Sequence, residues 1–287
     1  MDILTQQLVN GLVLGAVYAL VALGYTMVYG ILELINFAHG EIVMLGAMVC
    51  LSVILLLGGS GLPGWGLVLL GTLVAIPLCS AVGLVVERVA YRPLRHAPRL
   101  APLITAIGVS IFLQQVAMLI WGKQYLSFPP LLPTGRHEFL GAHITDVQIL
   151  ILVLASGFMA ALLWLVQRTR LGRAMRATAQ SPEVAGLMGI NVNRIIALTF
   201  MLGSALGAVA GVMVSAYYGQ AHYTMGFMLG LKAFTAAVLG GIGNIAGAVL
   251  GGLLLGVIES LAAGYVGDLT GGFLGSHYQD VFAFFVF

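Results

Sequence analysis

The 287-residue sequence predicts an all-α, polytopic membrane protein, and three observations lead to this fold class. Hydrophobic residues make up 60% of the chain and charged residues only 8%, whereas soluble proteins carry about 25% charged residues. The apolar runs are long enough for helices to cross a bilayer, and they lack the alternating segments of ~10 residues that mark a transmembrane barrel. The 39 glycines suit closely packed membrane helices. We therefore expect one membrane domain over residues 1–287.

About eight transmembrane helices are expected from the lengths of the apolar runs. Full spans are predicted at 5–29, 37–58, 65–88, 101–121, 146–167, 195–216 and 245–263. A shorter apolar segment at 226–239 is followed by Gly240–Asn244, so a broken or re-entrant helix is expected near 226–244. A last span begins near 278, and the seven residues after Asp280 are too few to cross a bilayer. We therefore expect the natural chain to continue past residue 287.

The arginines predict the orientation of the chain, because Lys and Arg in short loops resist translocation. Segments 88–99 and 168–194 are rich in arginine and are expected in the cytoplasm. The interval 122–143 has only one lysine and one arginine and several prolines, so it should be external and irregular. Counting back through the spans places the N-terminus outside. The direction of the chain after residue 225 stays open.

The longest polar interval, 168–194, contains a predicted short helix that can be read from its ends. Ser181 suits the N-cap, Pro182 suits the first helical position, and Glu183 lies favourably in the first turn. Gly189 can end the helix in the left-handed conformation. A helix this short is marginal alone, so we expect it to dock against another protein. The alternative is an ordinary positive-inside loop with a capped turn.

Polar residues also interrupt the apolar pattern at two other places. The stretch Glu33–Glu41 lies between the first two spans, at a predicted inner boundary where water is close. Because polar groups at membrane depth are costly and often functional, this stretch is either a helix junction or part of a pathway. Lys232 and Glu259 are isolated charges that can pair with each other, snorkel, or face an aqueous path, and the sequence leaves these alternatives open.

Enzyme chemistry is not expected from this sequence. It contains no nucleophile–base constellation, phosphate-binding loop or metal-binding spacing, and it has no Walker A motif. We therefore expect no cofactor on this chain and no nucleic-acid partner. If the protein is a pump, its energy source must be on another polypeptide. A membrane-embedded enzyme would need clustered reactive groups, for which Glu33–Glu41 is the only candidate.

Three stretches resemble the LivH-type permeases of branched-chain amino acid ABC importers, in family order. They are GYTMVYGILELINFAHGEIVMLGAMV (24–49), GRAMRATAQSPEVAGLMGIN (172–191) and KAFTAAVLGGIGNIAGAVLGGLLLGVIE (232–259). Glu183-Val184-Ala185, followed after three residues by Gly189, is also similar to the EAA-type loop of ABC permeases, with Val184 in place of the middle alanine. The later Ile and Leu-Pro positions of the fullest pattern are absent. In that family the loop forms a coupling helix that sits in a groove of the cytoplasmic ATPase.

The resemblance implies a heterodimeric permease that moves Leu, Ile and Val across a bacterial inner membrane. Its implied partners are a LivM-type second permease subunit, two cytoplasmic ATPase subunits that bind ATP and Mg, a periplasmic or lipid-anchored binding protein, and membrane lipids. The implied ATPase-coupling residues are Ser181, Pro182, Glu183, Ala185, Leu187, Met188 and Gly189, and the basic residues of the loop are Arg170, Arg173 and Arg176. The candidates for a translocation path are Asn36, His39, Glu41, Lys232 and Asn244.

Two alternatives to this function stay open. Similar systems carry urea and short amides, which form the nearest other substrate class. A stand-alone secondary transporter or channel would fit the broken helix equally well, but the spans contain no proton-relay chain of acids and histidines.

Overall fold

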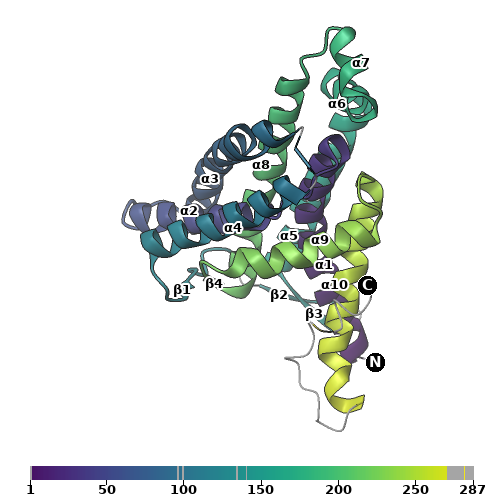
Figure 1. Ribbon diagram of the computed structural model, residues 1–287. Helices are drawn as coiled ribbons and strands as arrows, with labels where there is room; N and C mark the ends of the chain where they lie inside the picture. The colour runs from purple at the N-terminus through teal and green to yellow at the C-terminus, as the bar shows by residue number, and fades with distance from the viewer. Residues whose placement is uncertain are drawn as a thin grey trace.

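The computed structural model of this protein describes residues 2–95, 97–98, 100–133, 135–139, 141–269 and 281. Figure 1 shows a bundle of long helices, with two short helices projecting at one end and short strands lying toward the other. Within the described residues, seven helices are long and apolar enough to cross a membrane, and a shorter apolar helix lies at Met225–Leu239. The predicted all-α polytopic fold is therefore confirmed. The expected span near 278 falls outside the described residues.

The helices follow one another along the chain with bounds close to the predicted spans. The first four are α1 (Asp2–Leu32), α2 (His39–Leu57), α3 (Gly64–Val86) and α4 (Leu100–Trp121), and α3 continues through a π-helical turn, η1 (Glu87–Tyr91), and a 3-10 turn, η2 (Arg92–Leu94). The remaining helices are α5 (Asp146–Arg168), α6 (Arg170–Gln180), α7 (Pro182–Leu187), α8 (Val192–Tyr218), α9 (Met225–Leu239) and α10 (Ile245–Leu269).

The interval predicted to be external is more ordered than expected. It contains the strands β1 (Leu126–Ser127), β2 (Arg136–Phe139) and β3 (Ala142–Thr145). β2 and β3 form an antiparallel hairpin, and β1 pairs with β4 (Gln220–Ala221), which follows α8. The prediction of an irregular loop was wrong at these residues. The sequence did not reveal β1, because this two-residue strand is defined by its pairing with β4, almost a hundred residues away.

The centre of the bundle is formed by α1, α2 and α8. Within their most apolar stretches, 89% of the residues of α1 and 72% of those of α2 and of α8 are buried. The corresponding shares are 33% for α3, 22% for α4 and 28% for α5. These outer helices therefore present apolar side chains that only lipid or another membrane subunit can cover.

Glycine allows the tightest of the helix contacts, between α1 and α10. A Cβ atom added at Gly15 would lie 2.7 Å from the Cα of Leu253. The two helices run antiparallel, since Gly243 lies beside Gly30 at one end and Gly264 contacts Gln7 at the other. Backbone approach of this kind is typical of small residues in membrane helices.

The direction of the chain after residue 225, which the sequence left open, is now defined. α8 ends at β4, beside β1, and α9 leads back to the opposite end, where Gly243 meets Gly30 of α1. The 15 residues of α9 reach about 22 Å, less than the ~30 Å of a bilayer core. Gly241 and Gly243, with φ of +84° and +94°, form the turn into α10. The predicted helix break near 226–244 is confirmed, since α9 ends at Leu239 and α10 begins at Ile245.

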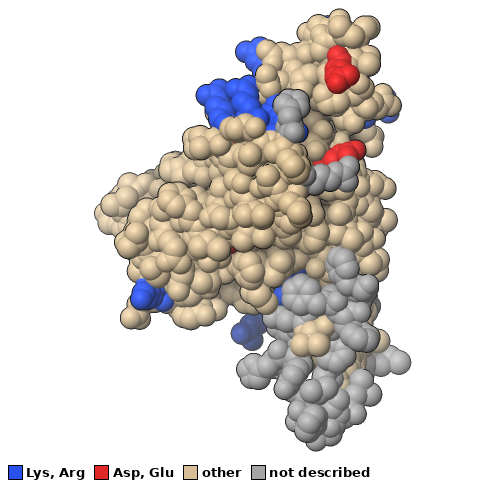
Figure 2. Space-filling view, in the orientation of Figure 1, with Lys and Arg blue, Asp and Glu red and all other residues tan. Residues whose placement is uncertain are grey.

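Both arginine-rich segments lie at the end of the bundle from which α6 and α7 project. The segment after α3 is bonded to the start of α8, and α8 begins where α7 ends. Figure 2 shows Lys and Arg gathered near this end. The hairpin β2–β3 lies at the other end (Figure 1). This arrangement matches the orientation expected from the positive-inside rule.

Candidate coupling site and translocation path

α7 starts as the sequence predicts. Ser181 is the N-cap, and its hydroxyl oxygen accepts a hydrogen bond from the backbone N–H of Val184 at 3.3 Å. Pro182 occupies the first helical position, where a backbone N–H would have no partner within the helix, so the lack of an N–H in proline costs nothing there. Glu183 lies in the first turn, where its negative charge opposes the positive end of the helix dipole.

The end of α7 is fixed by a glycine in the left-handed conformation. Gly189 has φ of +84° and donates its N–H to the carbonyl of Gly186 at 3.0 Å. Ile190 donates to the carbonyl of Ala185 at 3.0 Å. These two bonds form a Schellman motif around the C-cap residue Met188. The short helix is thus closed at both ends by its own sequence and has a defined shape in a protruding position.

The surface of α7 is apolar where it faces away from the bundle. Leu187 is 87% exposed, Met188 is 78% exposed and Val184 is 57% exposed, whereas Ala185 is buried against the rest of the chain. We call Val184, Leu187 and Met188 the tip of the arm, and the arm is α6 with α7. Figure 1 shows α7 at the extremity of the molecule. Grouped and exposed apolar side chains of this kind are typical of interaction surfaces.

α6 was not predicted, although the sequence carries a signal for it. Thr169 is its N-cap and accepts from the N–H of Gly172 at 3.1 Å. Met175 and Thr178 are buried on one face, while Arg170 and Arg173 are exposed on the other. The spacing of three to four residues among Leu171, Met175 and Thr178 is that of an amphipathic helix. The arginines between these residues prevent a continuous apolar run, so the helix was not recognised from apolar runs alone.

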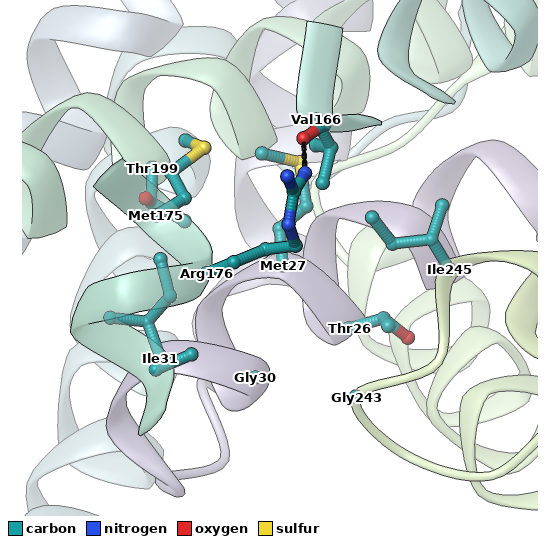
Figure 3. A pocket seen from close by; sticks show the side chains of 11 residues that line it. Thr26, Met27, Gly30, Ile31, Val166, Met175, Arg176, Thr199, Gly243 and Ile245 are labelled. Carbon is teal, nitrogen blue, oxygen red and sulfur yellow. Dashed lines mark hydrogen bonds between the residues drawn. The ribbon is translucent and has the colours of Figure 1, made fainter. Parts of the chain in front are cut away.

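The base of the arm packs on α5, α1 and α8, close to the turn that contains the helix break. Arg176 donates to the backbone carbonyl of Val166, the last turn of α5. Beside it lies a pocket of about 90 Å³ that α1, α5, α6, α8 and the turn before α10 line together. Figure 3 shows Thr26 of α1 and Gly243 of that turn on one side of the pocket and Thr199 of α8 on the other. The arm, α1 and the α9–α10 turn therefore border the same pocket.

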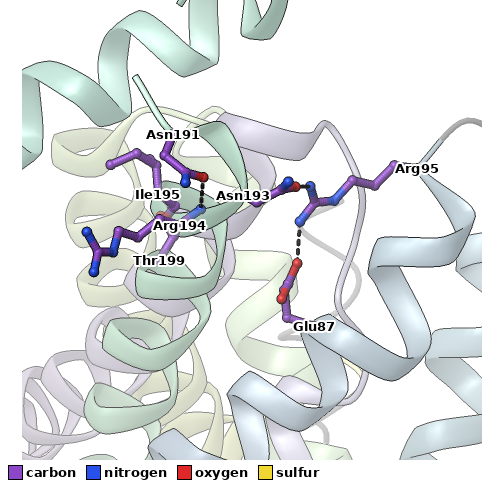
Figure 4. Close-up of polar contacts among 7 residues, drawn as sticks. All are labelled: Glu87, Arg95, Asn191, Asn193, Arg194, Ile195 and Thr199. Atoms are coloured by element: carbon purple, nitrogen blue, oxygen red, sulfur yellow. Dashed lines mark hydrogen bonds and ion pairs between the residues drawn. The ribbon is translucent and has the colours of Figure 1, made fainter. Parts of the chain in front are cut away.

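A second polar contact braces the start of α8. Arg95 donates to the amide oxygen of Asn193 at 2.6 Å and also bonds the buried carboxylate of Glu87 (Figure 4). Burial lowers the pKa of the Arg95 guanidinium, and the nearby Glu87 carboxylate opposes that shift. Asn191 caps α8 by accepting from the N–H of Arg194 at 3.1 Å. The segment after α3 is thereby attached to the point where the chain leaves the arm.

The polar residues of the second part of the Glu33–Glu41 stretch lie inside the protein, whereas Glu33 is exposed, which corrects one expectation in part. Asn36 is 2% exposed, His39 1% and Glu41 0%, so the expectation of nearby water was wrong for these three residues. The chain turns back after α1, and α2 begins beside the middle of α8 and the last third of α1. The amide oxygen of Asn36 accepts from the Tyr91 hydroxyl at 3.0 Å. Of the two alternatives for this stretch, the hydrogen bond of Asn36 fits a junction between helices.

His39 and Glu41 hold α2 against its neighbours. The His39 ring packs edge to face on Tyr25, with ring centroids 4.9 Å apart. One carboxylate oxygen of Glu41 accepts from Ser110 at 2.9 Å and from Gln114 at 2.8 Å, both on α4. The other oxygen has no hydrogen-bond partner among the described residues. Both side chains join helices, and neither lines a described pocket.

Lys232 and Glu259 do pair, which settles the alternative that the sequence left open. The Lys232 ammonium lies 2.7 Å from the Glu259 carboxylate, and the Tyr18 hydroxyl donates to the other carboxylate oxygen at 2.9 Å. Lys232 lines a pocket of about 220 Å³, together with Tyr125 and His222 near the strand end of the molecule. Of the translocation-path candidates, Lys232 alone borders a described pocket. Asn244 instead caps α10 by accepting from Gly247 at 3.2 Å.

These features define the class of protein: a multi-pass membrane permease with an arm outside the bilayer. The chain belongs to the family described as branched-chain amino acid transport system / permease component, whose profile matches residues 7–287. It is 50% identical to the high-affinity branched-chain amino acid transport system permease protein BraD of Pseudomonas aeruginosa, over 97% of this chain and 90% of that one. It is 47% identical to the permease protein LivH of Escherichia coli K12, with the same coverage. PsaBC from Streptococcus pneumoniae, solved with a Fab, is 14% identical with a TM-score of 0.45, covering 96% of this chain and 86% of that chain.

Proposed function

We propose that this chain is a permease subunit of an ABC importer that moves Leu, Ile and Val into the cytoplasm across the bacterial inner membrane. The apolar tip of the arm is the observation that carries the proposal, because it is exposed where a cytoplasmic partner can reach it. The names of the relatives, which are 47% and 50% identical, support the transport system and the substrate.

Energy enters through the arm. Two ATPase subunits bind ATP and Mg, and a groove on one of them receives Val184, Leu187 and Met188. Closure of the ATPases moves α7 and α6 together. Arg176 bonds α6 to α5, and α6 shares a pocket with α1 and the α9–α10 turn, so the displacement is passed toward the helix break through these neighbours. The bundle then switches between inward-facing and outward-facing arrangements as a two-state element.

The substrate path includes the pocket that Lys232 lines near the strand end of the molecule. The carboxylate of an amino acid in this pocket can approach the Lys232 ammonium, which keeps its pairing with the Glu259 carboxylate behind it. Met228 and Leu229 of the same pocket offer apolar contact to a branched side chain. A neutral amide such as urea would leave the Lys232 ammonium without a charged ligand group, so Lys232 favours a substrate with a carboxylate over that alternative.

Other components complete the importer. A binding protein, periplasmic or lipid-anchored, delivers the amino acid at the end that carries β1 and β4. A LivM-type permease subunit and lipid cover the apolar faces of the outer helices, of which α4 is only 22% buried in its most apolar stretch. Hydrolysis of ATP takes place on the ATPase subunits.

The proposal is tested by uncoupling uptake without removing the chain from the membrane. Glu183→Ala combined with Gly189→Ala should abolish amino acid uptake in cells, while the amount of chain in the membrane stays unchanged. Glu138→Ala is a matched control, since this carboxylate is 80% exposed on the hairpin at the other end. Unchanged uptake in the double variant would exclude α7 as the coupling helix. Purification in mild detergent without any ATPase subunit would instead favour a stand-alone transporter.

A further inference from the structure

A basic pocket of about 350 Å³ lies between the end of α3 and the start of α8. Arg88 of η1, Arg92 of η2 and Arg194 of α8 line it, and Asn191 and Asn193 complete its polar side. These residues come from two segments about a hundred positions apart. The brace formed by Arg95 and Asn193 holds the two segments together (Figure 4).

The positive charge of this pocket is not compensated within the described part of the chain. No carboxylate there lies within ion-pair distance of the side chains of Arg88, Arg92 or Arg194, and none of the three guanidinium groups has a hydrogen-bond partner. Glu87, which precedes Arg88 in the sequence, is buried and bonded to Arg95. The pocket also borders the N-terminal turn of the 27-residue helix α8, whose dipole adds partial positive charge. An anion fits this site.

The rest of the pocket is apolar and belongs to the membrane-spanning segments. Leu84 of α3 and Leu198 and Met201 of α8 form this part. Close by on the α3–η1 helix, Val85 is 58% exposed and Val89 is 72% exposed. The site therefore has arginines at the level of the cytoplasmic interface and hydrocarbon-facing side chains directly below them. A soluble anion would contact only the arginines, whereas a phospholipid would contact both the arginines and the apolar side chains.

We propose that this pocket binds the phosphate headgroup of an anionic phospholipid from the cytoplasmic leaflet, with an acyl chain along Leu84, Leu198 and Met201. Guanidinium groups recognise phosphate oxygens through paired hydrogen bonds, and the two asparagines add donors. Basic pockets between membrane helices on the cytoplasmic side are suited to such headgroups. The bound lipid would neutralise the repulsion among the three arginines at the point where the arm joins α8.

The inference does not depend on which solute is transported, and it is tested by lipid retention. The full chain, together with the subunits that copurify with it, is placed in nanodiscs of mixed phosphatidylglycerol and phosphatidylcholine, and lipids that survive detergent extraction are counted by native mass spectrometry. Arg88→Gln, Arg92→Gln and Arg194→Gln should each lower the retention of phosphatidylglycerol about fivefold, and the triple variant about a hundredfold.

Two control variants make the result decisive. A triple variant of Lys123→Gln, Arg136→Gln and Arg168→Gln removes the same charge elsewhere and should retain the lipid. Replacing Arg88, Arg92 and Arg194 by Lys keeps the charge that orients the chain and should restore most of the retention, which separates lipid loss from misfolding. Equal retention in the Gln triple variant would overturn the proposal. So would full competition by water-soluble glycerophosphoglycerol or inorganic phosphate, or loss of the lipid whenever ATPase subunits are bound.

Discussion

Truncation of the tip of the arm should detach the ATPase without unfolding the permease. The perturbation is Leu187→Ala combined with Met188→Ala. These side chains are 87% and 78% exposed, so they contribute little to the folded chain. Surface substitutions of this kind change the free energy of unfolding by about 0.5 kcal/mol or less. The effect should therefore fall on binding.

The magnitude follows from the surface that docking buries. Each substitution removes the equivalent of two to three methylene groups, at about 0.8 kcal/mol for each group buried. The pair then contributes about 4 kcal/mol to the interaction with the ATPase, and its loss raises the dissociation constant about a thousandfold. Uptake should fall to background at cellular concentrations of the ATPase.

The assay is a titration of ATPase subunits onto the tagged permease in mild detergent, with thermal unfolding measured in parallel. Leu55→Ala combined with Leu56→Ala is the matched control, since these leucines are 66% and 82% exposed at the other end of the molecule. An ATPase affinity within twofold of the original in the tip variant, with uptake intact, would refute the docking of Leu187 and Met188.

Three further predictions concern elements that shape the arm and the bundle. Gly189→Ala forces an alanine to φ of +84°, which costs about 1 kcal/mol. Uptake should therefore drop, while insertion into the membrane should not. The control is Gly186→Ala, which lies within α7 and also has free space around it, so it should not lower the melting temperature. Lys232→Met should destabilise the chain by about 3–5 kcal/mol, because it leaves the Glu259 carboxylate buried without its charged partner. Adding Glu259→Gln to this variant should recover part of the lost melting temperature. An unchanged melting temperature in the Lys232→Met variant would contradict the buried pair. Gly15→Ala would place a Cβ atom 2.7 Å from the Cα of Leu253 and should cost about 1–3 kcal/mol in thermal unfolding, whereas Gly108→Ala, with open space, should be neutral.

The sequence allowed the prediction of what depends on short-range chemistry. The spans could be predicted because a bilayer demands long apolar runs, and α7 because Ser181, Pro182 and Gly189 mark its ends. α6 was missed because its apolar face is narrow and is interrupted by Arg170 and Arg173. An amphipathic periodicity of 3.6 residues would have revealed it, since Leu171, Met175 and Thr178 follow that spacing.

Contacts between distant segments could not be predicted. The pairing of β1 with β4 joins residues that are far apart in sequence, and neither strand has a pattern of its own. The burial of His39 and Glu41 depends on how α2 packs on α1, α4 and α8, which composition does not reveal. The pairing of Lys232 with Glu259 was one of several arrangements that the sequence allowed, and only the placement of α9 against α10 selects it.

Cross-linking from the tip of the arm measures most directly whether α7 is the point of contact with the ATPase. The described cysteines, Cys50 and Cys79, are buried, so Leu187→Cys supplies an exposed thiol for a short maleimide–succinimidyl ester cross-linker applied to inside-out membrane vesicles. The expected result is one product that contains this chain and an ATPase subunit, and its yield should change when ATP is added. Labelling of that thiol by a membrane-impermeant maleimide from the periplasmic side, or cross-links only within the chain itself, would contradict the coupling role of the arm.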